Sequence, residues 1–251
     1  MTELDLIVDL HKDGHRQGPG GDDETQLAVA LSGLKDKPNL KIADIGCGTG
    51  ASTLVLAREL DAQVMAVDFL PAFLERLASE AEAAGLPDRV TTQAVSMDAL
   101  TFAPSSLDAI WAEGAIYNIG FETGVRAWRE FLKPGGILAV SELTWLTDVR
   151  PAELEAHWTG EYPEVATASA KMAILEQAGY APLGYFPLPK ACWLDNYYRP
   201  MQARFPVFLE RHDQSKAAQA IVRAEQAEID LYERYSDYFG YGYYVARRTA
   251  D

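Results

Sequence analysis

Short apolar runs alternate with segments of helical periodicity between residues 40 and 142. The runs expected to form strands are Leu40–Ile45, Ala62–Val67, Arg89–Val95, Leu107–Trp111 and Ile137–Ser141. The intervening segments long enough for helices are Ala51–Leu60, Pro71–Ala84 and Gly124–Leu132. This alternation predicts a parallel sheet with helices on both faces, because strands that run in one direction need crossover connections.

Further elements are expected on either side of this region. A glycine-rich loop, Gln17–Gly21, precedes a predicted helix over Asp22–Leu34, whose first turn is acidic. Towards the C-terminus we expect a helix over Ser169–Ala178 and two strands, Tyr180–Pro189 and Tyr241–Arg247. Residues 193–238 are helical in pattern and too long for a simple connection, so they are expected to form an inserted helical cap.

The charge of the chain narrows the classes of partner. Its 251 residues include 37 acidic and 22 basic side chains, which gives a net charge of −15. This excess argues against a nonspecific surface for nucleic acid. No run of about 18 apolar residues predicts a membrane span, and the N-terminus does not read as a signal peptide. We therefore expect a cytoplasmic protein that binds neither nucleic acid nor membrane.

The clearest indication of a ligand site is the segment Asp44-Ile45-Gly46-Cys47-Gly48-Thr49-Gly50. Its glycines permit positive φ and close approach of a ligand, and the helix that follows offers free backbone amides to a polar group. A tight turn without a ligand is the alternative. The spacing G-x-G-x-G departs from the dinucleotide pattern and resembles motif I of the class I S-adenosylmethionine-dependent methyltransferases.

Other segments follow in the order found in that family. Asp68 ends the second predicted strand, where an acid can accept hydrogen bonds from ribose hydroxyls; a helix N-cap before Pro71 is the alternative. The resemblance implies that Asp98 meets the adenine amino group while Met97 packs on the base; a loop or cap acid is the alternative for Asp98. Residues 133–136 resemble the family's turn before strand five.

The resemblance implies a complete architecture with S-adenosylmethionine as cofactor. We expect an α/β fold with a Rossmann-like, seven-stranded, mostly parallel sheet, an antiparallel last strand, helices on both faces and a helical cap insertion. One domain is expected over 1–251, with an N-terminal loop and helix in 1–39, the cofactor core in 40–142 and the cap in 193–238. The residues predicted to bind cofactor are Arg16, Gln17, Asp44, Gly46, Cys47, Gly48, Gly50, Asp68, Phe69, Met97, Asp98 and Glu113.

The acceptor site is predicted from its place beyond the carboxyl ends of the strands. Tyr117, Trp145 and Tyr197 are the predicted substrate-binding residues, with ordinary aromatic packing as the alternative. If the reaction needs a general base, the candidates are His15, Glu113 and Glu142. Cys47 and Cys192 have no partner spacing for a metal site, so none is expected.

Ten of the 12 tyrosines lie at or after Tyr180. Tyr232, Tyr235 and Tyr238 are spaced for one helical face, and we expect them to pack on the sheet rather than form an aromatic lid over substrate.

The predicted function is in-line methyl transfer to a small-molecule acceptor. A nicotinamide-dependent oxidoreductase shares the glycine loop and the acid after strand two, and a non-catalytic S-adenosylmethionine-binding protein would keep both; these remain alternatives. The acceptor atom and any homo-oligomer are left open by the sequence.

Overall fold

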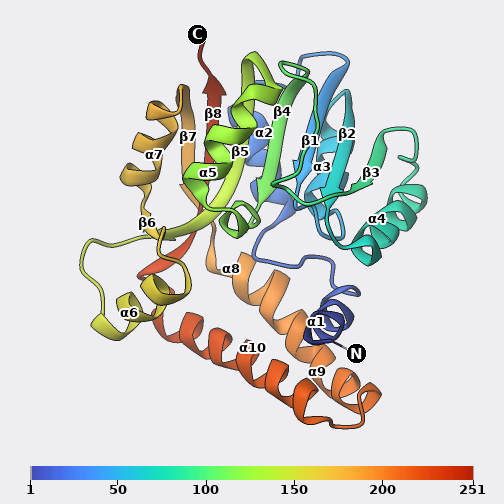
Figure 1. The fold of residues 1–251 in the computed structure, drawn as a ribbon, viewed down its shortest axis with the longest axis vertical. Helices are drawn as coiled ribbons and strands as arrows, with labels where there is room; N and C mark the ends of the chain where they lie inside the picture. The colour runs from blue at the N-terminus through green and yellow to red at the C-terminus, as the bar shows by residue number, and fades with distance from the viewer. Residues whose placement is uncertain (1, 251) are drawn as a thin grey trace.

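A computed structural model describes residues 2–250, and its centre is a single mixed sheet (Figure 1). The strand order is β3-β2-β1-β4-β5-β8-β7, and a short strand β6 pairs with the end of β5. The strands are β1 (Leu40–Ile45), β2 (Ala62–Asp68), β3 (Val90–Ala94), β4 (Leu107–Glu113), β5 (Leu132–Trp145), β6 (Ala166–Thr167), β7 (Tyr180–Pro187) and β8 (Phe239–Arg248). Only β8 runs against its neighbours, pairing antiparallel with both β5 and β7.

Each face of the sheet carries its own apolar core because side chains alternate along the strands. On one face, Ile42 and Trp111 join a cluster with α2 (Asp22–Ser32), α3 (Ala51–Glu59) and α4 (Pro71–Ala83). On the other, Ala43 and Ile110 pack with α5 (Phe121–Trp128) and α7 (Ala168–Gln177). The sheet, its one reversed strand and the helices on both faces confirm the predicted fold class.

A helical segment between β7 and β8 extends beyond the edge of the sheet (Figure 1). It consists of α8 (Lys190–Trp193), a π-helical turn (Leu194–Tyr198), α9 (Arg199–Arg211) and α10 (Lys216–Tyr235). Ser215 caps α10 by accepting a hydrogen bond from the Ala218 amide. Tyr232 and Tyr235 of α10 are buried in the apolar core, as expected for packing rather than for a lid.

Two helices were not expected from the sequence. The helix α1 (Glu3–His11) begins with a Thr2–Asp5 capping box and packs against α9 and α10. The helix α6 (Ala152–Glu161) follows Pro151, and its polar sequence gives little apolar periodicity. Strand β5 also continues to Trp145, four residues beyond its predicted end at Ser141.

No helix within residues 2–250 has the length and apolar character needed to cross a membrane. Over the same residues, no group of three or more histidine, cysteine or acidic side chains is placed to hold a metal ion.

Candidate cofactor and acceptor sites

The glycine loop connects β1 to α3 at the carboxyl edge of the sheet. Gly46, Gly48 and Gly50 all have positive φ, at 71°, 55° and 88°. A Cβ added to Gly46 would lie 2.4 Å from the Ala115 Cβ, and one added to Gly50 would lie 2.1 Å from a Leu77 methyl. The backbone here therefore requires glycine for its conformation and for the close approach of its neighbours.

Asp68, at the end of β2, holds this loop in place. Its Oδ2 accepts a hydrogen bond from the Gly48 amide at 3.0 Å, and its Oδ1 accepts one from Leu70 at 2.9 Å. The N-cap position of α4 is Leu70, so Asp68 is not the N-cap that the alternative interpretation proposed. Each carboxylate oxygen can accept a further hydrogen bond, which leaves capacity for a ribose hydroxyl.

Asp44 lies beneath the loop and is fully buried. Its Oδ2 accepts hydrogen bonds from Ser52 Oγ at 2.8 Å and Thr53 Oγ1 at 2.6 Å, whereas its Oδ1 has no hydrogen-bond partner. Burial raises the pKa of Asp44 to about 7, although the two hydroxyl donors oppose the shift. An unpartnered buried carboxylate oxygen next to the loop fits a site for a polar ligand.

Replacing Asp44 by asparagine is expected to change how stability depends on pH. The pKa of Asp44 is about 7 in the folded protein, against an ordinary value of 3.8, so the folded chain binds more protons than the unfolded chain over this range. Stability conferred by the protonated form is therefore lost as pH rises. Urea denaturation should show that, between pH 5 and 8, the free energy of unfolding of the wild type falls by about 2–3 kcal/mol relative to that of Asp44→Asn. Parallel pH profiles for the two proteins would contradict this.

The segment between α1 and α2 lies over the glycine loop. Gln17 Oε1 accepts hydrogen bonds from the Thr49 amide at 2.8 Å and from its hydroxyl at 3.0 Å. Thr49 Oγ1 also lies 3.0 Å from the Gly14 carbonyl oxygen, and Gln17 donates to that same oxygen through Nε2. This network fixes the N-terminal segment against the proposed cofactor loop.

Glu113, at the end of β4, joins four parts of the fold. Its Oε1 accepts hydrogen bonds from Thr25 of α2 at 2.6 Å, Tyr243 of β8 at 2.9 Å and the Trp111 indole at 3.3 Å. Its Oε2 accepts one from Arg16 Nη1 at 3.0 Å. Both oxygens are thus engaged, an arrangement suited to positioning Arg16 and less suited to accepting a substrate proton.

A narrow cavity opens between the N-terminal segment and the glycine loop. Its volume is about 70 Å³. Predicted cofactor residues that line it are Arg16, Gln17, Gly46, Cys47, Gly48 and Glu113. This volume is below the range of about 300–1,000 Å³ typical of pockets for small molecules. This cavity therefore holds only part of a nucleoside-sized cofactor.

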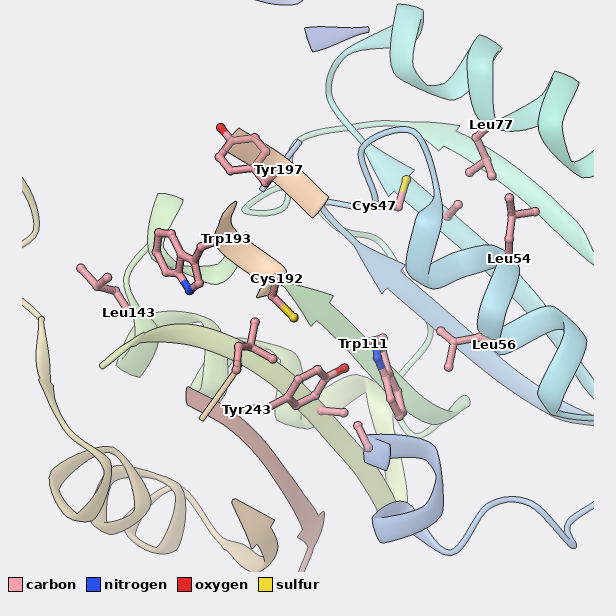
Figure 2. Packing of buried hydrophobic residues seen from close by; sticks show 14 of the residues in the cluster. Cys47, Leu54, Leu56, Leu77, Trp111, Leu143, Cys192, Trp193, Tyr197 and Tyr243 are labelled. Carbon is pink, nitrogen blue, oxygen red and sulfur yellow. The ribbon is translucent and has the colours of Figure 1, made fainter. Parts of the chain in front are cut away.

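A second cavity, of about 270 Å³, adjoins the first. The two share Gln17, Gly18, Pro19 and Gly114 in their walls. Tyr117 and Tyr197, both predicted substrate residues, line the second cavity. Figure 2 shows Trp193 and Tyr197 of the cap segment, with Leu143 of β5 near Trp193, and all three belong to this wall.

Two of the predicted catalytic residues lie outside both cavities. The His15 side chain is 70% exposed, and its Nε2 lies 3.9 Å from Asp22 because the neighbouring Arg16 takes the inward position. Glu142 is fully buried, and burial raises its pKa to about 7 while the nearby Lys171 opposes that shift. Neither side chain lines either cavity, and a catalytic role for either remains a prediction.

Trp145 is likewise not in the acceptor cavity. The extension of β5 carries it away from the carboxyl edge of β4, where it is buried under the Arg150 guanidinium, 4.3 Å from its ring. Of the remaining predicted cofactor residues, Met97 lies beside Gly46, whereas Phe69 and Asp98 are exposed and line neither cavity. Cofactor contacts for these three remain predictions.

Several residues of the two sites were not found by sequence reasoning. Thr25, Thr49 and Tyr243 each support the cofactor cavity through one side-chain hydrogen bond or more. The second cavity adds Trp158, Glu161, Tyr162, Glu228 and Tyr241. The concentration of tyrosines towards the C-terminus was the available signal for Tyr241, but nothing in the sequence distinguished it from tyrosines that pack in the core.

Gly46→Ala is expected to disrupt the loop more than an equivalent change elsewhere. The new side chain would have to adopt φ of +71° and would meet Ala115 at 2.4 Å. The positive φ costs about 1–2 kcal/mol, and relief of the clash moves the loop backbone. We expect calorimetry to show cofactor binding weakened at least about tenfold, following the usual relation between affinity and free energy.

Gly85→Ala is the matched control. Gly85 has the same φ of +71° but nothing within 4 Å of a Cβ. It should lower the free energy of unfolding by about 1 kcal/mol and leave cofactor affinity unchanged. Equal affinity losses in both variants would contradict a specific role for Gly46.

Comparison with known proteins finds relatives for part of the chain. Residues 42–136 match a family model described as a methyltransferase domain. Methyltransferase GfsG of Streptomyces halstedii is 32% identical over 47% of this chain and 44% of its own length. The chain spans about half the length of the curated relatives it matches.

Solved structures show the same fold over nearly the whole chain. YjhP of E. coli superposes with a TM-score of 0.82 at 21% identity, covering 98% of this chain and 99% of that one. A SAM-dependent methyltransferase from Geobacter sulfurreducens, solved with S-adenosyl-L-homocysteine, gives a TM-score of 0.82 at 18% identity, covering 96% and 97%. Residues 42–136 thus resemble a methyltransferase domain, as the glycine loop predicted, and the whole chain has the fold of these solved structures.

Proposed function

We propose that this protein transfers a methyl group from S-adenosylmethionine to a small-molecule acceptor by in-line displacement. The observation that carries the proposal is the shared wall of the two cavities, formed by Gln17, Gly18, Pro19 and Gly114. A donor beside the glycine loop and an acceptor among the aromatic side chains would meet across that wall. The methyltransferase family match supports the same reaction class.

The residues of the first cavity, and Asp68 beside the glycine loop, fit this cofactor in chemical type. Asp68 offers acceptor capacity for ribose hydroxyls, and Arg16 retains donors beyond those it gives to Glu113 and Asp22. Arg16 or Gln17 would hold the methionyl carboxylate through hydrogen bonds. When bound, the cofactor supplies a methyl group on a positively charged sulfur.

The contribution of the protein is alignment and exclusion of water. Displacement at carbon requires nucleophile, methyl and sulfur to lie in line, so holding both molecules in fixed geometry accounts for much of the acceleration. The closed N-terminal segment and the buried aromatic walls would keep water from the reacting atoms.

Calorimetry with S-adenosylmethionine, followed by measurement of S-adenosylhomocysteine release with metabolite pools, tests the proposal. We expect binding below millimolar cofactor and release that depends on the pool. Absence of binding at millimolar cofactor would refute it, and tighter binding of NADH would favour the oxidoreductase alternative. Binding without release across broad pools would favour a non-catalytic cofactor-binding protein.

A further inference from the structure

The second cavity has an unusual combination of side chains. Six aromatic residues contribute to its wall: Tyr117, Trp158, Tyr162, Trp193, Tyr197 and Tyr241. Two acids, Glu161 and Glu228, complete the polar part. Among the described residues, no lysine, arginine or histidine lines the cavity. The wall is therefore rich in π-electron faces and carries negative charge.

Glu228 is the inner acid of this cavity. It lies on α10 and accepts a hydrogen bond from the Tyr198 hydroxyl at 2.8 Å. Burial raises the pKa of its carboxyl, and the neighbouring Glu225 adds to that effect, while His11 opposes it. A positive ligand group would favour the charged form of this carboxyl.

Lys171 is a buried cation that lies behind Tyr162 of the cavity wall. Lys171 Nζ lies 5.3 Å from the Tyr162 ring centre and 4.5 Å from that of Phe121, and it donates to the Glu164 carbonyl. It also interacts with the buried carboxylate of Glu142, so it does not offset Glu228 within the cavity.

The cavity wall also contains two tryptophan side chains whose indole nitrogens are buried. The Nε1 atoms of Trp158 and Trp193 are buried and have no hydrogen-bond partner. Trp193 itself is 2% exposed. An indole N–H can only donate and an ammonium group has no acceptor atom, so these two residues would recognise a cation through their ring faces alone.

We propose that the acceptor is a basic amine, held as its ammonium form by the aromatic and acidic wall, with its nitrogen as the methylated atom. This inference rests on the proposed methyltransferase function. Cationic groups are attracted to aromatic faces, most strongly where water is excluded, and to a buried carboxylate. An anionic acceptor would meet repulsion from Glu228, and a neutral one would gain neither interaction.

The same wall suits the course of the reaction. The ammonium first gives a proton to a carboxylate, for which Glu228 is placed, and this exposes the nitrogen lone pair. That pair forms the new C–N bond while the C–S bond breaks and its electrons pass to sulfur. Positive charge therefore moves from sulfur to nitrogen, and the methylated ammonium faces the same π-electron surfaces.

Three ligands that share one scaffold and differ in the charge of one end test the inference through binding measurements alone. Phenethylamine, 2-phenylethanol and 3-phenylpropanoate share a phenethyl group and differ in carrying a positive, neutral or negative end. Titrated calorimetrically into protein saturated with S-adenosylhomocysteine at pH 7, the amine should bind about tenfold more tightly than the alcohol. The carboxylate should bind more weakly than the alcohol.

Substitutions test whether the preference for the amine arises in this cavity. Glu228→Gln keeps the shape of the side chain and should remove most of the preference for the amine. Asp230→Asn removes the same charge from an exposed position of α10 and should leave the preference intact. Tyr117→Leu removes an aromatic face from a residue that is 43% exposed, and should lower amine affinity without a loss of melting temperature.

The outcomes separate this inference from the function on which it rests. Failure of S-adenosylhomocysteine to bind would refute the methyltransferase proposal itself. Tight binding of S-adenosylhomocysteine with no preference for the amine, including no binding of any probe, would overturn the amine inference alone. A preference that survives in Glu228→Gln and Tyr117→Leu would place the cation elsewhere and overturn it as well.

Discussion

Asp68→Ala is expected to raise the dissociation constant for S-adenosylmethionine about 100-fold. The carboxylate of Asp68 accepts two backbone hydrogen bonds, from Gly48 and Leu70, and is the predicted partner of the ribose. A hydrogen bond to a charged group contributes about 1.5–3 kcal/mol, so loss of the ribose bonds and of loop order together gives an effect of this size. Isothermal calorimetry measures it directly.

Asp36→Ala provides the control for that measurement. Asp36 is exposed and precedes the N-terminal end of β1, at the opposite edge of the sheet from the glycine loop. It removes the same charge and should leave affinity unchanged. A loss below about threefold in Asp68→Ala, or an equal loss in both variants, would show that Asp68 does not hold the cofactor.

Glu113→Ala is expected to lower the free energy of unfolding by about 3–5 kcal/mol. Its side chain is 8% exposed, and its removal leaves the buried Arg16 guanidinium with only the half-exposed Asp22 as a partner and takes away the acceptor of three hydroxyl and indole donors. Breaking a buried ion pair by deleting one member costs this much because the other charge remains desolvated. Urea denaturation monitored by tryptophan fluorescence measures the change.

Two further variants make this result specific. Glu122→Ala breaks an exposed ion pair with Arg126 and should cost less than about 1 kcal/mol. Glu113→Gln keeps most hydrogen bonds and should weaken cofactor binding together with stability. If Glu113 were instead the general base, the glutamine variant would lose turnover while cofactor affinity stayed intact.

The sheet and the cofactor loop were predictable because both depend on short-range rules. The run from Leu40 to Ile45 is apolar enough for a buried strand, and glycine spacing marks the turn that follows. Helix α6 gave no such pattern, since its polar sequence contributes only Leu154 to the buried core. Its place depends on tertiary contacts that no local periodicity records.

The direction in which the catalytic candidates point could not be predicted, for a related physical reason. Strand alternation decides which side chain faces a cavity, and a neighbouring side chain can take the inward position. His15 and Arg16 are adjacent, yet Arg16 pairs with Glu113 while His15 faces solvent. Likewise Leu143 lines the acceptor cavity, whereas the adjacent Glu142 points into the protein interior. Sequence order placed these residues near the site but could not assign their direction.

Gln17, Gly18 and Pro19 belong to the walls of both cavities, and this sharing links the two binding equilibria. When a first ligand orders these residues, it meets the entropy cost of ordering them, and the second ligand does not have to meet that cost again. Thermodynamic reciprocity then requires that the factor by which cofactor changes acceptor affinity equals the factor by which acceptor changes cofactor affinity. A metabolite that occupies the aromatic cavity would thereby alter the affinity of the protein for the cofactor.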